Sequence, residues 1–245
     1  MPVYKLPDEL FFPPSEEAEK DGLIAVGGDL SLERLLLAYH LGIFPWYTEG
    51  SPILWWSPDP RLILEPKNLK IPKSLNKVIK KDIFTITLDQ AFEDVVRGCA
   101  QANRPDGKGT WIVDDMIRAY GRLHQAGFAH SVEAWFEGEL VGGLYGVSLG
   151  KVFFGESMFY RMKNASKVAF VHLVRLLQKW GFNLIDCQIT TDHLIRFGAH
   201  EIPRSQFLKR LFKALQHKTR CGHWSFPEEP FPKPPKPTSA LTYEG

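Results

Sequence analysis

Three consecutive strand patterns in the middle of the chain constrain its fold more than any other feature. Residues 130–136 and 139–147 alternate in polarity across a Glu-Gly turn, and a third strand is expected over residues 151–156. A helix over residues 165–180 and a short apolar strand over residues 183–188 follow. Strands flanked by helices in this order predict an α/β chain with a central mixed, largely antiparallel sheet that is covered on both faces.

Elements upstream and downstream of this sheet extend the same pattern. Residues 84–88 alternate like a strand, and Asp89 is expected to cap a helix that ends near residue 100. Further helices are predicted over residues 114–126 and 204–217. The alternation of strands and helices therefore runs through most of the chain.

The first 60 residues have a different character. Ser31 or Asp29 can cap a helix expected over residues 32–41, directly after a pair of glycines that suits a tight turn. Prolines then interrupt an aromatic-rich stretch that no long helix accommodates. We therefore predict a small N-terminal domain at residues 1–60, a larger domain at residues 61–226 and a Pro-rich tail at residues 227–245.

Composition limits the class of protein. Apolar residues make up 44% of the chain and charged residues 24%, which argues against a disordered chain or a coiled coil. The 3 cysteines are widely spaced, so no disulfide framework is expected. The start of the chain lacks the order of a signal peptide, and no apolar run approaches the roughly 20 residues that span a bilayer. These features predict a cytoplasmic protein with no membrane partner.

Two polar side chains stand out at the end of the strand expected over residues 183–188. A period of two places Asp186 and Gln188 on one face of that strand. Glu156 is expected at the end of another apolar strand. Each residue alone is better explained by a cap or an ion pair, but two buried strands with such ends in one sheet raise the case for a functional cleft.

Some aromatic residues are better pocket candidates than others. Most aromatic side chains pack in a core, whereas Trp46, Trp55 and Trp56 lie in segments interrupted by prolines. Loops of this kind often line binding sites. We therefore expect part of a pocket to come from the first 60 residues.

A run of lysines follows the predicted domain boundary. Its members are spaced so that a helix would present them on one face, and they are Lys73, Lys77, Lys80 and Lys81. Such a face suits phosphate groups, although a solvated face with no partner explains the spacing equally well. The net charge of +2 is too small to require a nucleic-acid partner.

Several common motifs are absent from the chain. It has no GxGxxG, GxxxxGK[ST] or HExxH sequence, so the usual marks of dinucleotide, NTP and zinc-protease sites are missing. The histidines show no spacing typical of metal ligands. We therefore expect no cofactor and no metal ion.

Seven short phrases between residues 27 and 204 are more specific in combination than any one of them alone. In chain order they read GGDL, GIFPW, WWSPDPR, GTWI, GESMF, DCQ and GAHEIPR. Together they resemble the leucyl/phenylalanyl-tRNA–protein transferase family of bacteria. The resemblance covers nearly the whole chain apart from its ends.

This resemblance implies a fold and an activity. The larger domain is expected to be similar to the GNAT acyltransferase fold. The activity would move Leu or Phe, with Met as a further candidate, from aminoacyl-tRNA to the N-terminal Lys or Arg of acceptor proteins, which marks them for degradation. The aminoacyl side chain would occupy an apolar pocket lined by Trp46, Trp111, Tyr120, Leu144, Phe153 and Leu173. Leu144 and Leu173 depart from the family, in which Met and Phe are more common at these positions.

The implied reaction is aminolysis of an ester that is already activated, so no ATP is needed. Asp186 and Gln188 are implicated at the reacting centre. Because an amide is a poor base, we expect Gln188 to orient the amine and Asp186 to polarise Gln188. Glu156 is expected to attract the cationic acceptor, and the lysine face to bind tRNA.

Two other functions compete with this interpretation. An acyl-CoA-dependent N-acetyltransferase of the GNAT type would share the architecture, but residues 157–164 lack the Gly-rich loop that holds the pyrophosphate of that cofactor. A noncatalytic module that only binds tRNA or basic N-termini is the other alternative. It predicts that Asp186→Ala changes no measurable activity.

Overall fold

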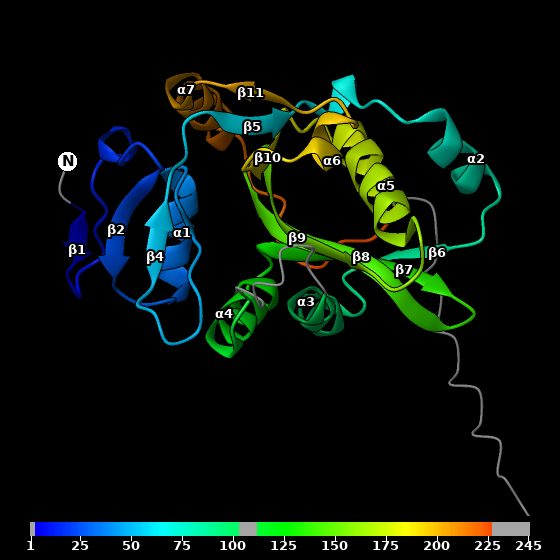
Figure 1. Ribbon diagram of the computed structural model, residues 1–245, viewed down its shortest axis with the longest axis horizontal. Coiled ribbons are helices and arrows are strands. Elements are labelled where there is room, and N and C mark those ends of the chain that lie inside the picture. The colour runs from blue at the N-terminus through cyan, green and yellow to red at the C-terminus, as the bar shows by residue number, and fades with distance from the viewer. Residues whose placement is uncertain (1–2, 103–111, 227–245) are drawn as a thin grey trace, which may run out of the picture.

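The computed structural model describes residues 3–102 and 112–226, which form two β-sheets (Figure 1). The smaller sheet has four strands in the order β1-β2-β4-β3, and the larger has seven in the order β11-β5-β10-β9-β8-β7-β6. The smaller sheet ends at Trp56 and the larger begins at Arg61. This division agrees with the predicted change of character near residue 60, while the domain limits themselves stay a prediction. The predicted tail at residues 227–245 lies outside the described residues.

The smaller sheet carries a single α-helix. Ser31 caps this helix, because its Oγ accepts the backbone N–H of Arg34 at 3.3 Å. Strand β1 runs parallel to β2, and β4 pairs antiparallel with both β2 and β3. The elements are β1 Tyr4–Leu6, β2 Leu23–Gly27, α1 Leu32–His40, β3 Phe44–Pro45 and β4 Leu54–Trp56, with a 3-10 turn at Ser15–Glu17.

The larger sheet is mixed and largely antiparallel, as predicted, because only β9 and β10 run parallel. Its strands are β5 Arg61–Leu64, β6 Thr85–Leu88, β7 Ala129–Phe136, β8 Glu139–Leu149, β9 Val152–Tyr160, β10 Leu184–Gln188 and β11 His200–Ile202. The helices between them are α2 Lys73–Lys80, α3 Phe92–Gln101, α4 Asp114–Gln125, α5 Ala165–Lys179, α6 Asp192–Ile195 and α7 Arg204–Leu215, with a 3-10 turn at Pro66–Asn68.

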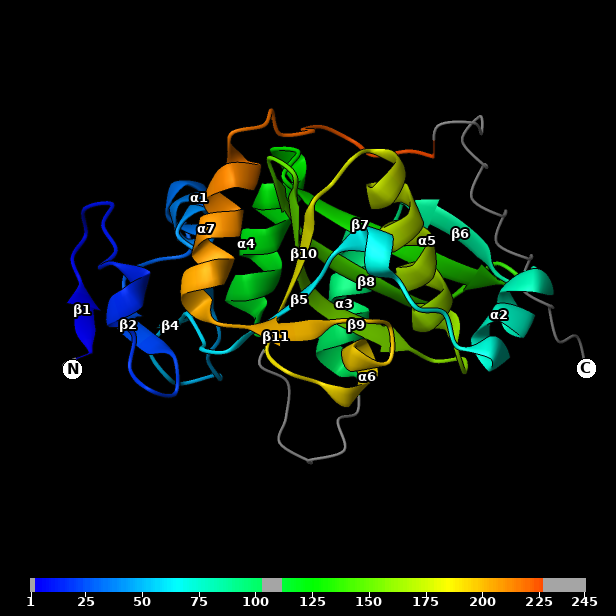
Figure 2. The same cartoon turned by 90° about the horizontal axis from the view of Figure 1, so that it is seen from above.

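Helices cover both faces of this sheet, which confirms the predicted layers (Figures 1 and 2). Helices α3 and α4 pack on one face and α5 on the other. Neighbouring residues of β8 show the two sides, since Leu144 belongs to the core under α5 and Tyr145 to the core under α3 and α4. The N-terminal helix α1 packs against α4 and α7, so the two sheets share one of these cores. Within residues 3–102 and 112–226, no helix has the length and apolar character needed to cross a bilayer.

The prediction that Asp89 caps a helix is wrong. Helix α3 begins only at Phe92 and has no side-chain cap. Asp89 instead adopts a left-handed backbone with a φ of 55°, and its carboxylate accepts the backbone N–H groups of Ser131 at 2.8 Å and Trp224 at 2.7 Å. Its buried carboxylate therefore ties the segment after α7 to the sheet.

Candidate active site

A bulge in β9 determines where Glu156 points. Gly155 pairs with Gly146 of β8 and Ser157 pairs with Tyr145, so Glu156 is an extra residue without a partner in this ladder. The expectation that Glu156 ends its strand is wrong, because β9 continues to Tyr160. Bulges of this kind redirect a side chain and are common beside active sites.

A second bulge lies next to the first, in β10. Asp186 pairs with Ile63 of β5 and Gln188 pairs with Leu62, so Cys187 is the extra residue. Gln188 has a φ of 62°, in the left-handed region that non-glycine residues seldom adopt. The parallel pairing of β9 and β10 ends at Asp186, so both bulges lie where these two strands part. The end of β10 is therefore not the regular alternating strand that the sequence predicts.

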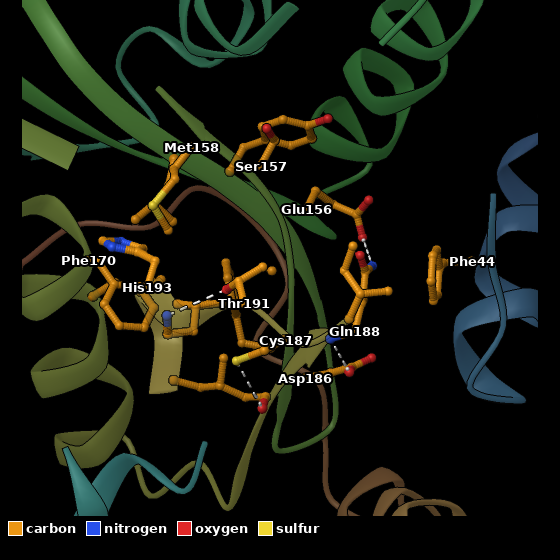
Figure 3. Close-up of a pocket in the computed structure, with 18 of the residues that line it drawn as sticks. Phe44, Glu156, Ser157, Met158, Phe170, Asp186, Cys187, Gln188, Thr191 and His193 are labelled. Atoms are coloured by element: carbon orange, nitrogen blue, oxygen red, sulfur yellow. Dashed lines mark hydrogen bonds between the residues drawn. The ribbon is translucent and has the colours of Figure 1, made fainter. Parts of the chain in front are cut away.

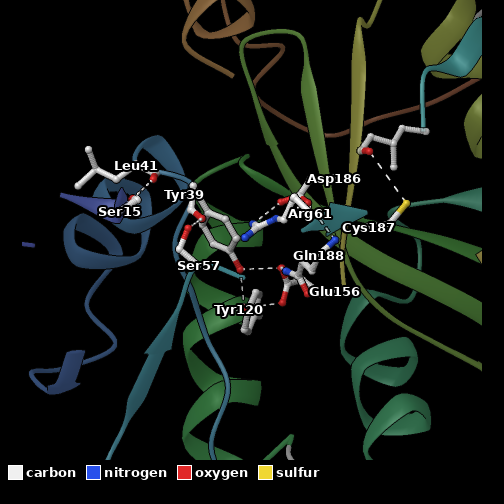
Figure 4. A network of polar contacts seen from close by, with 12 residues as sticks. Ser15, Tyr39, Leu41, Ser57, Arg61, Tyr120, Glu156, Asp186, Cys187 and Gln188 are labelled. Carbon is white, nitrogen blue, oxygen red and sulfur yellow. Dashed lines mark hydrogen bonds and ion pairs between the residues drawn. The ribbon is translucent and has the colours of Figure 1, made fainter. Parts of the chain in front are cut away.

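Glu156 is the centre of a buried polar network (Figure 4). Its Oε1 accepts the hydroxyl of Tyr39 and the side-chain amide of Gln188, each at 2.8 Å. Its Oε2 lies 2.8 Å from the hydroxyl of Tyr120, and the two tyrosine hydroxyls lie 2.6 Å apart. The network joins α1 of the smaller sheet to α4, β9 and β10.

Burial changes the acid–base properties of this network. Loss of solvent raises the pKa of Glu156 from 4.5 to about 7, and the nearby charge of Asp186 raises it as well. Hydrogen bonds from Tyr39, Tyr120 and Gln188 oppose this rise. Burial also holds the pKa of both tyrosines well above 10.0. Glu156 is therefore poised to exchange a proton near neutral pH.

Asp186 is held by a buried arginine. Arg61 Nε and Nη2 donate to the two carboxylate oxygens at 2.8 and 2.7 Å, a bidentate arrangement that fixes both side chains. The guanidinium lies between the rings of Phe44 and Phe207, 4.9 and 4.5 Å from their centroids. The expected polarisation of the Gln188 amide by Asp186 has a different form here, because Asp186 accepts the backbone N–H of Gln188 at 2.9 Å.

A cavity of about 290 Å³ opens beside this network (Figure 3). One wall is polar and contains Glu156, Asp186 and Gln188. The remainder is largely apolar, and most of its side chains belong to the core under α5. Its apolar lining includes Phe44, Trp46, Leu144, Phe153, Met158, Phe170, Leu173, Ile185 and Leu194.

The structure brings together most of the predicted pocket residues. The four that line the cavity are Trp46, Leu144, Phe153 and Leu173. Tyr120 does not line it and instead contacts Glu156 from behind the polar wall. Trp111 lies outside the described residues. Trp55, a further pocket candidate, is fully buried and donates its indole N–H to the carbonyl of Gly27.

The predicted basic face exists on α2 but lies apart from the cavity. Lysines 73, 77, 80 and 81 are exposed, whereas Leu75 is buried and anchors the helix beside α5. Figure 2 shows α2 at the end of the larger sheet that is remote from α1. These lysines therefore cannot touch a group bound at the polar wall.

Sequence reasoning missed two residues of the site, Tyr39 and Arg61. Tyr39 lies on the apolar side of α1 with Leu35, and the sequence pattern predicts a core position for a tyrosine there. Arg61 ends the phrase WWSPDPR, which was its only signal. Among the residues that the structure describes, no group of three or more His, Cys, Asp or Glu side chains is arranged to hold a metal ion.

Family models match both parts of the chain. The model described as leucyl/phenylalanyl-tRNA protein transferase matches residues 63–212, and the model of the N-terminal domain of that family matches residues 28–59. Together they include Tyr39, Tyr120, Glu156, Asp186 and Gln188, whereas Arg61 lies in the gap between them. The break between the two models, residues 60–62, follows β4 and includes the first two residues of β5.

Curated relatives agree over nearly the whole chain. The leucyl/phenylalanyl-tRNA–protein transferase of Syntrophobacter fumaroxidans is 61% identical over 224 residues, which cover 91% of this chain and 96% of the relative. The protein of the same name from Anaeromyxobacter sp. strain Fw109-5 is 61% identical over 225 residues, or 91% and 95% of the two chains.

Solved structures are much more distant. A conserved protein of unknown function from Staphylococcus epidermidis overlays with a TM-score of 0.39 and 12% identity, over 74% of this chain and 68% of its own. This likeness is too low to carry an argument about the fold. The expected similarity to the GNAT fold therefore stays a prediction.

Proposed function

The chain belongs to the leucyl/phenylalanyl-tRNA–protein transferase family, and we propose that it transfers Leu or Phe, or Met, from aminoacyl-tRNA to the N-terminal Lys or Arg of acceptor proteins. One observation carries this proposal beyond the family name. A single cavity joins an apolar part to a polar wall of Glu156, Asp186 and Gln188. An aminoacyl ester likewise combines an apolar side chain with a polar reacting group.

The apolar part suits the side chain of the transferred amino acid. Phe153, Leu144 and Leu173 surround it without a charged group, and a cavity of about 290 Å³ is large enough for one aromatic or branched aliphatic side chain. The ester carbonyl would then lie at the polar wall. Trp46, which is 37% exposed, lines the cavity and directly follows β3 of the smaller sheet.

The chemistry requires positioning more than strong bases. The α-amine of an acceptor has a pKa of about 8, so an appreciable fraction is neutral near pH 7. Gln188 would orient this amine or the tetrahedral intermediate. Asp186 supports that role by holding the backbone of Gln188, and Arg61 in turn holds Asp186. A rigid arrangement of this kind raises the effective concentration of the amine at the ester.

The basic face of α2 would bind the body of the tRNA rather than its acylated end. Its exposed lysines can neutralise phosphates, and α2 lies far from the polar wall. This placement fits a long substrate whose reacting end enters the cavity while the rest lies along the protein. We place the activity in the cytoplasm, where the transferred residue would mark acceptor proteins for degradation.

The rival acetyltransferase is not proposed. The segment that would hold the pyrophosphate of acyl-CoA begins inside β9, which continues to Tyr160, and it contains no glycine between Ser157 and Asn164. Helix α5 begins after Asn164 with no side-chain cap.

Transfer of label from charged tRNA tests the proposed function. The protein is incubated with labelled Phe-tRNA and a peptide that starts with Arg, and label is expected on that peptide but not on one that starts with Asp. Gln188→Ala should abolish most of the transfer, whereas the matched variant Gln216→Ala should not, because Gln216 is exposed and its side-chain amide donates to the carbonyl of Phe212 in α7. Transfer of acetyl groups from acetyl-CoA, or no transfer from tRNA by the folded protein, would refute the proposal.

A further inference from the structure

Glu156, Tyr39 and Tyr120 form a closed ring of oxygen–oxygen contacts (Figure 4). The two tyrosine hydroxyls lie 2.6 Å apart, and each lies 2.8 Å from a different oxygen of the Glu156 carboxyl. All three distances are typical of O–H···O hydrogen bonds. Each side of the ring therefore needs one hydrogen atom.

The two tyrosines supply only two of these hydrogens. If Glu156 were ionised and both tyrosines donated to it, their oxygens would face each other at 2.6 Å with no proton between them. A buried contact of that kind is costly. A proton on Oε2 completes the ring, because Glu156 then donates to Tyr120, Tyr120 donates to Tyr39, and Tyr39 donates to Oε1.

We propose that Glu156 is a neutral carboxylic acid in the resting protein, that Tyr39 and Tyr120 are the positioning residues that hold its proton, and that this acid protonates the ribose oxygen that leaves during transfer. The identity of the leaving group rests on the proposed function, whereas the protonation state of Glu156 rests on the ring alone. The proposal gives Tyr39, which lies in helix α1, a part in the reaction.

The charges around the ring are consistent with a neutral carboxyl. Burial raises the pKa of Glu156 to about 7, and no unpaired cation opposes this among the described neighbours, since Arg61 is bound to Asp186. The titratable and charged groups that face the ring are Tyr39 of α1, Tyr120 of α4, Tyr145 of β8, and Asp186 of β10 with Arg61 of β5 behind it. A neutral Glu156 does not attract the acceptor by charge, so proton donation replaces the role expected from the sequence.

The transfer step balances with a single proton. The amine nitrogen forms a bond to the ester carbon, and the bond from that carbon to the ribose oxygen breaks with its electron pair passing to the oxygen. Glu156 gives its proton to this oxygen, and the resulting carboxylate takes the proton that the new amide nitrogen loses. One proton has moved from the amine to the ribose, and Glu156 ends each turnover as it began.

Infrared difference spectra between the protein and its Glu156→Gln variant test the ring without substrate. Glutamine can keep every contact, since its N–H donates to Tyr120 and its C=O accepts from Tyr39. The spectrum should contain the C=O stretch of a carboxylic acid at about pH 6 and lose it with a midpoint of about 7. Absence of this band at about pH 6 from the folded pair would overturn the ring.

Tyr39→Phe tests whether the Tyr39 hydroxyl donates to Glu156. A purely structural role of Tyr39 would leave the C=O frequency of Glu156 unchanged. Oε1 loses a hydrogen-bond donor, so the C=O band of Glu156 should shift to higher frequency. Glu133 offers a matched control, because it is a buried carboxyl bonded by Ser131 and Thr87 and does not line the cavity. Its band, isolated with Glu133→Gln, should not respond to Tyr39→Phe. An unchanged Glu156 band would remove Tyr39 from the ring.

The dependence of the single-turnover rate on pH tests the acid role. For the unaltered protein, the single-turnover rate plotted against pH should follow a bell-shaped curve. The rate rises as the amine is deprotonated and falls as Glu156 ionises above a pH of about 7. Glu156→Gln should be slower by roughly 10²–10⁴-fold and keep only the rising limb. A bell retained in that variant would overturn the acid role. Loss of transfer from tRNA in the unaltered protein, with the infrared band present, would instead refute the proposed function and leave the ring in place.

Discussion

Replacing Glu156 by glutamine should change how the stability of the protein depends on pH. Unfolding exposes this carboxyl and returns its pKa from about 7 to 4.5. The folded protein therefore binds a proton, between these two values, that the unfolded chain does not bind. Because the native state holds more protons in this range, raising the pH destabilises the protein there.

The size of this effect follows from the two pKa values. A difference of about 2.5, at about 1.4 kcal/mol for each pKa unit, corresponds to about 3 kcal/mol. The variant carries no titratable group at this position. Relative to Glu156→Gln, the protein should therefore lose about 3 kcal/mol of unfolding free energy from about pH 4.5 to about pH 7, and no more above the upper limit.

Urea denaturation of both proteins at a series of pH values measures this difference directly. The difference between the two unfolding free energies is plotted against pH, so that contributions from all other groups cancel. The reasoning fails if the difference is constant across this range, or if the protein gains stability over the variant as the pH rises.

Three further changes have definite expected outcomes. Arg61→Met leaves the buried carboxylate of Asp186 without its partner and should lower the unfolding free energy by about 3–5 kcal/mol, measured by denaturation; a loss below about 1 kcal/mol would contradict the structure. Leu173→Phe fills the apolar part of the cavity and should lower kcat/KM for Phe-tRNA by roughly 10-fold or more relative to Leu-tRNA, whereas an unchanged ratio would place the side chain elsewhere. Lys80→Ala combined with Lys81→Ala should make the slope of log affinity for tRNA against log salt shallower by about 1–2, and an unchanged slope would exclude these lysines from the tRNA site.

Elements with a long, regular pattern are predictable from the sequence. The helix predicted over residues 165–180 is observed as Ala165–Lys179, because its apolar side faces a continuous core. The strands around the central turn are also confirmed, at Ala129–Phe136 and Glu139–Leu149. These elements depend mainly on which face is buried, and polarity along the chain records that face.

The geometry of the site depends on irregularities that polarity does not record. A bulge adds one residue to a strand without changing its composition, so the sequence pattern does not reveal that Glu156 and Cys187 lack partners in their ladders. A tyrosine on the apolar side of a helix gives no sign that its hydroxyl meets a carboxyl 117 positions later, as Tyr39 does. Contacts between such distant positions are set by the packing of the two sheets.

The contact between Tyr39 and Glu156 has a consequence for how the two parts of the chain evolved. The carboxyl that Tyr39 contacts belongs to the larger sheet, and Trp46, which directly follows β3 of the smaller sheet, lines the same cavity. A chain that began at residue 61 would keep the pair of Arg61 and Asp186 but lose one member of the ring and part of the cavity lining. Neither half can therefore be exchanged for an unrelated module without loss of the centre, and the two are expected to have been inherited as a unit.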